Sequence, residues 1–113
     1  MSDLVPANVT VPTLPTLRKY GLDEEAWAAI GDRQDWVCPC GRFPGKGTFR
    51  IDHEHVKGWK TMAPADRTRY VRGLVCWTCN FFQLAKGVTS ARLRALADYL
   101  DEYERRRDAH DEV

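Results

Sequence analysis

Four cysteines, arranged as two close pairs, constrain the fold of this chain more than any other feature of its sequence. Cys38 and Cys40 form one pair, and Cys76 and Cys79 form the other. Four thiols at such spacings can form disulfides, act in redox chemistry or bind one tetrahedral Zn²⁺. Residues 1–17 lack the basic and apolar stretches of a signal peptide, so we expect a reducing cytoplasm. The sequence therefore favours structural zinc held by all four cysteines.

A structural metal suits a chain of this size. The 113 residues fit one small domain with a modest core, which a metal helps to stabilise. Hydrophobic residues make up 43% and charged residues 29%, which is typical of a globular protein rather than a disordered one. No apolar run approaches the length of a membrane span, so we expect no membrane association.

The net charge of +1 hides an uneven distribution. Residues 38–88 contain nine Lys and Arg but three acids, a net charge of +6. The flanks are acidic, with −3 over residues 1–37 and −2 over residues 89–113. A basic middle is typical of a phosphate-binding module, although a basic solvated surface has the same composition.

The residue pattern of the first half of the chain predicts an extended N-terminal arm, a helix and a strand. Three prolines within residues 1–16 indicate an extended, mobile arm. A helix is expected over residues 21–30, with Asp23 as N-cap and Gly31 at its end. Apolar residues alternate over residues 48–52, which predicts a strand.

The second half predicts a strand between helical segments. We expect a short helix within residues 62–70, a strand over 71–76 and a helix over 79–86. A long helix is expected over residues 89–107. The domain organisation is then an arm (1–16), a central domain (17–88) and a C-terminal helix with its tail (89–113).

The C-terminal helix carries an apolar stripe at helical spacing, formed by Leu93, Leu96, Ala97, Leu100 and Tyr103. Such stripes more often pack within their own chain than against a second copy, so we expect internal packing. A homodimer through this helix is the alternative.

The tetrapeptide Asp52-His53-Glu54-His55 directly follows the first predicted strand. Strand alternation places Asp52 and His53 on opposite faces, but a bend at a strand end can bring both to one site. The tetrapeptide alone is compatible with a solvated loop, a second zinc site or a catalytic site.

Asn80, next to Cys79, supplies a second hard oxygen atom. Asp52 and Asn80 are ligand types that suit Mg²⁺ rather than Zn²⁺. His53, with an ordinary pKa of about 6.5, suits a general base that deprotonates water near neutral pH. These roles together are typical of phosphodiester hydrolysis.

Several segments spanning residues 17–80 form one pattern, namely residues 17–27, Gln34, Cys40-Gly41, Ile51–His55, Tyr70–Cys76 and Cys79-Asn80. This pattern resembles the phage recombination endonuclease VII family, within the ββα-metal (His-Me finger, HNH) nucleases. The resemblance implies a small α+β fold with a zinc-stapled ββα-metal core and flanking helices. It also implies the cytoplasm of a bacterial or phage-infected cell.

The same resemblance implies roles for individual residues. The four cysteines would bind structural zinc, and Asp52 and Asn80 would bind catalytic Mg²⁺ or Mn²⁺. His53 would be the general base, and His55 would hold the site together or contact phosphate. Arg72 is a candidate phosphate contact or, equally, a structural ion-pair partner. Further candidate contacts to DNA are Lys57, Lys60 and Lys86.

Three departures from the family pattern stand out. Cys38-Pro-Cys40 replaces the usual C-x-x-C, which leaves Cys38 the less certain ligand. Gln83 stands where the family often has an acid, which would weaken cation binding or change metal preference. One C-terminal helix replaces the long extension by which junction resolvases dimerise.

Two main functions are compatible with these sequence features. The first is a metal-dependent DNA endonuclease that acts on branched or otherwise structured DNA. The alternative is a non-catalytic zinc-knuckle module that binds nucleic acid. Intact Asp52, His53 and Asn80 favour the enzyme. A redox or zinc-storage role leaves the basic segment unexplained.

Overall fold

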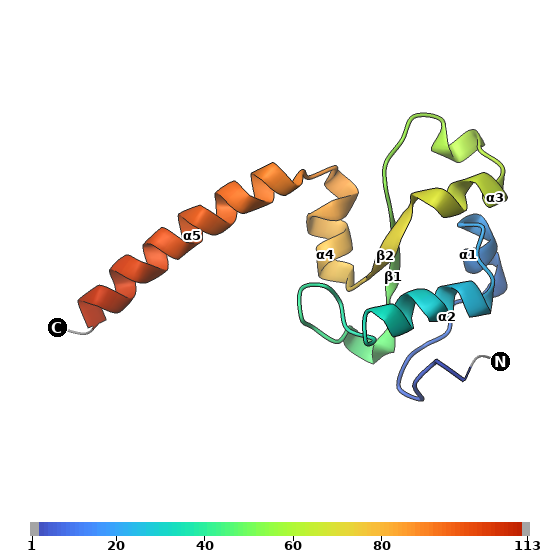
Figure 1. Ribbon diagram of the computed structural model, residues 1–113, viewed down its shortest axis with the longest axis horizontal. Coiled ribbons are helices and arrows are strands. Elements are labelled where there is room, and N and C mark those ends of the chain that lie inside the picture. Colours follow the sequence, from blue (N-terminus) through green and yellow to red (C-terminus); the bar gives the residue numbers. More distant parts are fainter. Residues whose placement is uncertain (1–2, 112–113) are drawn as a thin grey trace.

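The computed structural model describes residues 3–111, except the side chains of residues 85, 110 and 111, as a small α+β fold (Figure 1). Its elements are α1 (Leu14–Lys19), α2 (Glu24–Arg33), β1 (Arg50–His53), α3 (Pro64–Arg67), β2 (Val71–Val75), α4 (Trp77–Phe82) and α5 (Ser90–Asp111). Short 3₁₀ turns lie at Gly45–Gly47, Trp59–Thr61, Thr68–Tyr70 and Leu84–Lys86. The predicted α+β class is confirmed.

The two strands form an antiparallel sheet with an irregular register. Ile51 lies opposite Leu74 and Asp52 opposite Gly73, but His53 lies opposite Val71. Arg72 is therefore an extra residue on β2, and the strand bulges there. Both strands were predicted from sequence, although β1 begins at Arg50 rather than at residue 48.

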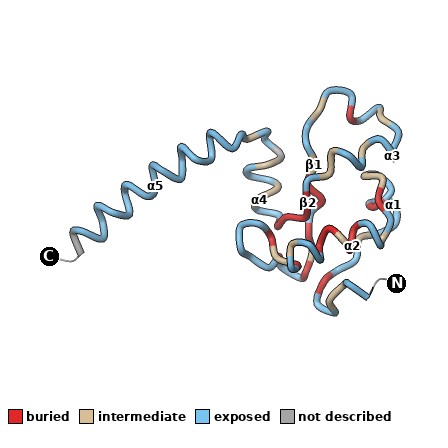
Figure 2. The backbone as a smooth tube through the Cα atoms, in the orientation of Figure 1, coloured by how far each residue is buried: buried red, intermediate tan, exposed pale blue. Residues whose placement is uncertain are grey.

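The hydrophobic core lies between the sheet and α2, where the buried segments cluster in Figure 2. Trp27 of α2 and Leu74 of β2 are fully buried, and the rings of Trp27 and Trp36 lie 5.2 Å apart. The predicted cap is confirmed, since Asp23 Oδ1 accepts a hydrogen bond from the Ala26 N–H at 2.7 Å.

Gly31 does not end α2, which continues to Arg33, so the expectation of a helix stop there is wrong. Its role is packing instead. The ring of Trp36 occupies the space into which a Cβ at Gly31 would project. A residue with a side chain at this position would displace Trp36 from the core.

The N-terminal segment is not extended through Thr16, because α1 begins at Leu14. Pro15 is tolerated there because the first turn of a helix needs no intrahelical N–H. Upstream of α1, Val9 is buried, and the Thr10 N–H donates to the Gly47 carbonyl at 3.0 Å. The segment is thereby attached to the body.

α5 projects away from the body (Figure 1), and its residues 90–109 are exposed (Figure 2). Thr89 caps it by accepting a hydrogen bond from the Arg92 N–H at 3.2 Å. Leu96, Leu100 and Tyr103 are each about half exposed. The expectation that the stripe packs within the chain is wrong, because no other element lies beside the helix beyond its start. Among residues 3–111, no helix combines the length and apolar character that crossing a membrane requires.

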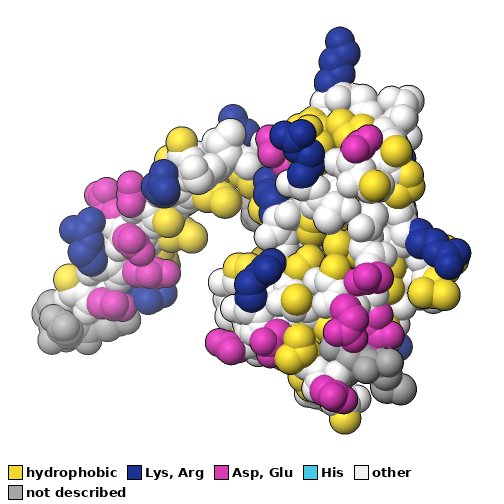
Figure 3. All heavy atoms as spheres, turned by 45° about the vertical axis from the view of Figure 1, so that its right-hand side comes forward, with side chains coloured by type: hydrophobic (Ala, Val, Ile, Leu, Met, Phe, Trp, Pro, Cys, Tyr) yellow, Lys and Arg dark blue, Asp and Glu magenta, His cyan; other side chains and the backbone are white. Residues whose placement is uncertain are grey.

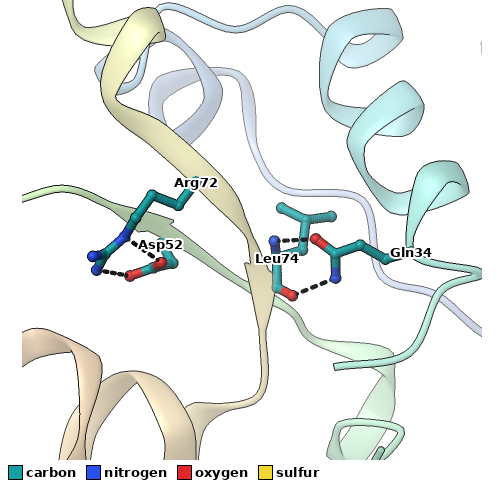
Figure 4. A network of polar contacts seen from close by, with 4 residues as sticks. All are labelled: Gln34, Asp52, Arg72 and Leu74. Atoms are coloured by element: carbon teal, nitrogen blue, oxygen red, sulfur yellow. Dashed lines mark hydrogen bonds and ion pairs between the residues drawn. The ribbon is translucent and has the colours of Figure 1, made fainter. Parts of the chain in front are cut away.

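The outer edge of β2 is closed by a side chain rather than by a third strand. The Gln34 Nε2 donates to the Leu74 carbonyl at 2.7 Å, and its Oε1 accepts from the Leu74 N–H at 2.8 Å (Figure 4). A Cβ at Gly73 would lie 2.6 Å from this Oε1. Because Gly73 has no side chain, the Gln34 amide has room to form hydrogen bonds with the backbone N–H and carbonyl of Leu74.

We expect Gln34→Met to lower the free energy of unfolding by about 2–4 kcal/mol, because it leaves two buried backbone groups of Leu74 without partners. Chemical denaturation measures this loss. Arg33→Met, an exposed neighbour on the same helix, is the matched control and should cost less than about 0.5 kcal/mol. Equal stability of the two variants would contradict the prediction.

Candidate active site and metal centre

The four cysteine sulfurs gather into one cluster. The Sγ atoms of Cys38, Cys40, Cys76 and Cys79 all lie within 4.8 Å of one another, and Cys40 and Cys76 are 3.9 Å apart. Four sulfurs about 2.3 Å from a tetrahedral zinc ion are separated by about 3.8 Å. The cluster thus has the dimensions of a zinc site, and Cys38 belongs to it despite the short spacing of its pair.

The protonation of these thiols differs from one cysteine to the next. Burial raises the pKa values of the Cys38 and Cys79 thiols above their ordinary range. At Cys40, a hydrogen bond from the backbone of Arg42 lowers the pKa to about 7. Buried thiols with raised pKa values keep their protons unless a cation replaces them. All four cysteines are free, so the donor set is available for zinc.

Asp52 at the sheet bulge is only 5% exposed, and its charge is compensated by Arg72. The Arg72 Nε and Nη2 donate to the two carboxylate oxygens at 2.8 and 2.9 Å (Figure 4). Of the two roles considered for Arg72, phosphate contact and ion-pair partner, the structure shows the ion pair. A carboxylate has about four acceptor positions, so two remain for a cation. Asp52 lines a hollow of about 540 Å³ together with Cys79 and Gln83.

His53 is packed among aromatic rings. Its imidazole stacks on Trp59, with ring centres 4.3 Å apart and planes inclined by 21°. Tyr20 and His55 also contact it, at 5.6 and 5.1 Å between ring centres. Burial, followed by repulsion from His55, lowers the pKa of His53 below its ordinary value. The imidazole is therefore neutral near pH 7, the form that can accept a proton.

The hollow beside His53 is basic. It measures about 510 Å³ and is lined by His53, His55, Lys19 and Lys60, among others. Lys60 is a candidate identified from the sequence, whereas Lys19 is not, because it lies in the acidic N-terminal flank. Two ammonium groups beside a neutral imidazole suit a phosphate group.

Arg67 holds the walls of this hollow together. Its guanidinium donates to the carbonyls of Trp59 at 3.0 Å, Lys19 at 2.9 Å and Lys60 at 2.9 Å. It also lies 4.3 Å from the centre of the Trp59 ring. Sequence reasoning counts Arg67 as one more surface cation and passes over Trp59, although both support the surroundings of His53.

Asn80 is not among the residues that line the hollows of Asp52 and His53. It lines a hollow of about 300 Å³ with Tyr20 and Arg50, and its helix α4 packs against β1. Asp52, His53 and Asn80 therefore line three different hollows of the described chain. Tyr20 connects two of them, since it contacts His53 and also lines the hollow of Asn80.

Two other candidate DNA contacts are not among the residues that line these hollows. Lys57 is exposed in the loop that follows His55. Lys86 follows α4, and its Nζ is 5.4 Å from the centre of the Phe81 ring. The predicted cations are thus distributed over more than one surface.

A family model described as recombination endonuclease VII matches residues 14–102. The chain belongs to this family. Searches of curated proteins and of solved structures found no match. The match runs from α1 into α5 and covers the cysteine cluster, Asp52, His53 and Asn80. Membership in this family implies an endonuclease that acts on DNA.

We expect the protein to bind one zinc ion per chain and to lose it on Cys76→Ser or Cys38→Ser substitution, because each removes one of four ligands. Both changes should lower the free energy of unfolding by several kcal/mol, and so should a chelator. Thr78→Ser, at an exposed position between two ligands, is the control that should keep its zinc. Metal analysis and thermal unfolding test this, and full zinc content in Cys38→Ser would remove Cys38 from the ligand set.

Proposed function

We propose that the protein is a metal-dependent endonuclease that hydrolyses phosphodiester bonds, with β1, β2 and α4 forming a ββα-metal core. The observation that carries the proposal is the position of His53. A neutral imidazole at the end of β1 borders a hollow lined by Lys19 and Lys60, directly after the buried carboxylate of Asp52. General base, phosphate-binding cations and metal-ligating oxygen thus occur on adjacent parts of the fold.

The chain's own residues account for the proton transfer. His53 accepts a proton from the attacking water, and the stack with Trp59 restricts the rotation of its ring. Lys19 and Lys60 hold the negatively charged phosphate beside the imidazole. Arg67 keeps both backbone segments in place through its three hydrogen bonds.

Asp52 is the proposed ligand of Mg²⁺ or Mn²⁺, with the amide oxygen of Gln83, which lines the same hollow, as a weaker neighbour. Asn80 lines a different hollow and is proposed as the second ligand on the family resemblance. Their hard oxygens fit such a cation, and Asp52 keeps free acceptor positions beside Arg72. When bound, the cation supplies polarisation of the scissile phosphate and stabilisation of charge on the leaving oxygen. Arg72 would contact phosphate when it is released from Asp52.

Branched or otherwise structured DNA is the proposed substrate, and membership in the recombination endonuclease VII family supports DNA as the substrate class. A reducing cytoplasm, as in a bacterial or phage-infected cell, is the compartment in which four thiols stay available for zinc.

We expect the zinc-loaded protein to nick plasmid or branched DNA with Mg²⁺ or Mn²⁺, and His53→Ala to slow this about 10²–10⁴-fold through loss of the base. Asp52→Asn should also impair cleavage because it removes the charge that binds the cation. Gel analysis of cleavage rates provides the measurement.

Asp66→Asn is the matched control for Asp52→Asn, because Asp66 is exposed on α3. It should cleave at the wild-type rate. A wild-type protein that binds DNA but cuts no supercoiled, branched or heteroduplex substrate would instead support the non-catalytic zinc-knuckle module.

We also propose that α5 joins two copies of the chain. Its apolar stripe stays exposed in one copy, and hydrophobic side chains on this helix are visible in Figure 3. A helix of 22 residues is about 33 Å long, which is enough for a paired interface. Two active sites in one particle would suit cleavage of both strands of a branched substrate.

We expect sedimentation to show a dimer at micromolar concentration and Leu100→Gln to weaken it, because the change places an amide in the apolar stripe. Glu102→Gln, on the opposite side of the helix by helical spacing, should leave the dimer unchanged. A wild-type protein that stays monomeric at high concentration would exclude this interface.

A further inference from the structure

Outside the site described above, α4 exposes a cluster of three aromatic rings, Trp77, Phe81 and Phe82. These residues are 48%, 47% and 53% exposed. Trp77 and Phe81 stack with planes inclined by 10° and centres 4.9 Å apart. Phe82 meets both edge-on, at 5.6 and 5.0 Å. The rings thus form one continuous aromatic surface, here called the aromatic patch.

This patch is unusual within the molecule. The other three tryptophans are buried, so Trp77 is the single exposed indole of the chain. The patch is also fixed next to the metal centre, since Trp77 lies between Cys76 and Cys79 and Phe81 follows Asn80. Contiguous exposed apolar surface of this kind indicates a binding site.

The charge around the patch indicates the chemistry of its partner. The stretch of chain that includes the patch, residues 67–97, contains no Asp or Glu and six Lys and Arg, of which Arg67 and Arg72 are engaged elsewhere. One of these cations, Lys86, has its Nζ 5.4 Å from the centre of the Phe81 ring. The complementary ligand carries negative charge and has flat aromatic faces, as nucleic acid has.

We infer that the aromatic patch, with Lys86, stacks against unpaired bases of the DNA substrate. In a paired duplex each base face is covered by its neighbours, so an aromatic side chain reaches a face only where a base is unpaired or unstacked. The inference rests on the proposed function, because it takes DNA as the substrate. It adds that the enzyme recognises DNA by its unpaired bases, through residues outside the hydrolytic site.

A second copy of the chain fits the patch less well. A symmetric contact between two copies would bring the same surface face to face, with Lys86 against Lys86 and no acid in residues 67–97 to balance it. The stripe of α5 differs, because acids lie among its neighbours in sequence, at Asp98, Asp101, Glu102 and Glu104.

Binding can be measured on the zinc-loaded full chain with the His53→Ala substitution, which slows cleavage, and without added Mg²⁺ or Mn²⁺. The probes are a labelled duplex with a bulge of unpaired thymines and the same duplex fully paired. We expect Trp77→Ala and Phe81→Ala each to weaken binding of the bulged probe at least about fivefold, and that of the paired probe much less. Trp77→Phe should retain most of the affinity. Tyr99→Ala is the control, because Tyr99 is an exposed aromatic residue on α5.

A second measurement follows the stacking directly. Binding of the bulged probe should quench tryptophan fluorescence, and Trp77→Phe should remove this quenching while the buried indoles still emit. Zinc content and the unfolding midpoint of each variant show that the fold is intact, and Phe81→Ala provides an independent variant if Trp77→Ala fails to fold.

The inference would be overturned if Trp77→Ala and Phe81→Ala lost equal affinity for the bulged and paired probes, or lost affinity for neither. A change in sedimentation of Trp77→Ala with unchanged DNA affinity would overturn it as well and assign the patch to contact between copies. The cleavage assay separates the two proposals. If the wild-type protein cleaves DNA and Trp77→Ala keeps the same preference for bulged over paired DNA, the base-stacking role alone is disproved. If the wild-type protein cleaves no DNA at all, the proposed hydrolysis is disproved.

Discussion

The cluster of four sulfurs is the constraint on which the rest of this structure depends. α4 has six residues and is too short to be stable alone. Beside the main core, the described chain has a second small cluster built from Cys38, Val75 and Cys76. Two of its three residues are proposed zinc ligands, so a zinc ion bound there would replace much of the hydrophobic core that α4 otherwise lacks. Asn80 and the aromatic patch keep their places relative to β1 for this reason.

The sheet depends on polar contacts in the same way. Two strands alone are marginally stable, and here the edge of β2 that faces away from β1 is satisfied by the Gln34 amide. At the bulge, the buried charge of Asp52 requires compensation, which Arg72 provides. While both guanidinium bonds hold, Arg72 is not available to DNA. The Asp52 carboxylate, the proposed metal ligand, is thus held in a defined position by Arg72.

Local signals in the sequence predict much of this architecture. The Asp23 cap, both strands and the gathering of the cysteines follow from residue type and spacing. The failures have a common cause, which is contact between distant segments. Helical periodicity shows that one face of α5 is apolar but not what covers it. Gly31 resembles a helix stop until Trp36 is seen against it, and Arg67 resembles a surface cation until its bond to the Lys19 carbonyl is known.

The same contacts change the meaning of the basic segment. Two of its nine cations are occupied, Arg67 by carbonyl groups and Arg72 by Asp52, while Lys19 joins the site from an acidic flank. Of the other cations, Lys60 lies with Lys19 beside His53, Arg50 lines the hollow of Asn80, and Lys86 lies beside the aromatic patch. A single DNA molecule that reaches both His53 and the aromatic patch must extend from the end of β1 to α4. Backbone hydrolysis and recognition of unpaired bases would then occur on one substrate, with their separation set by the sulfur cluster that fixes α4.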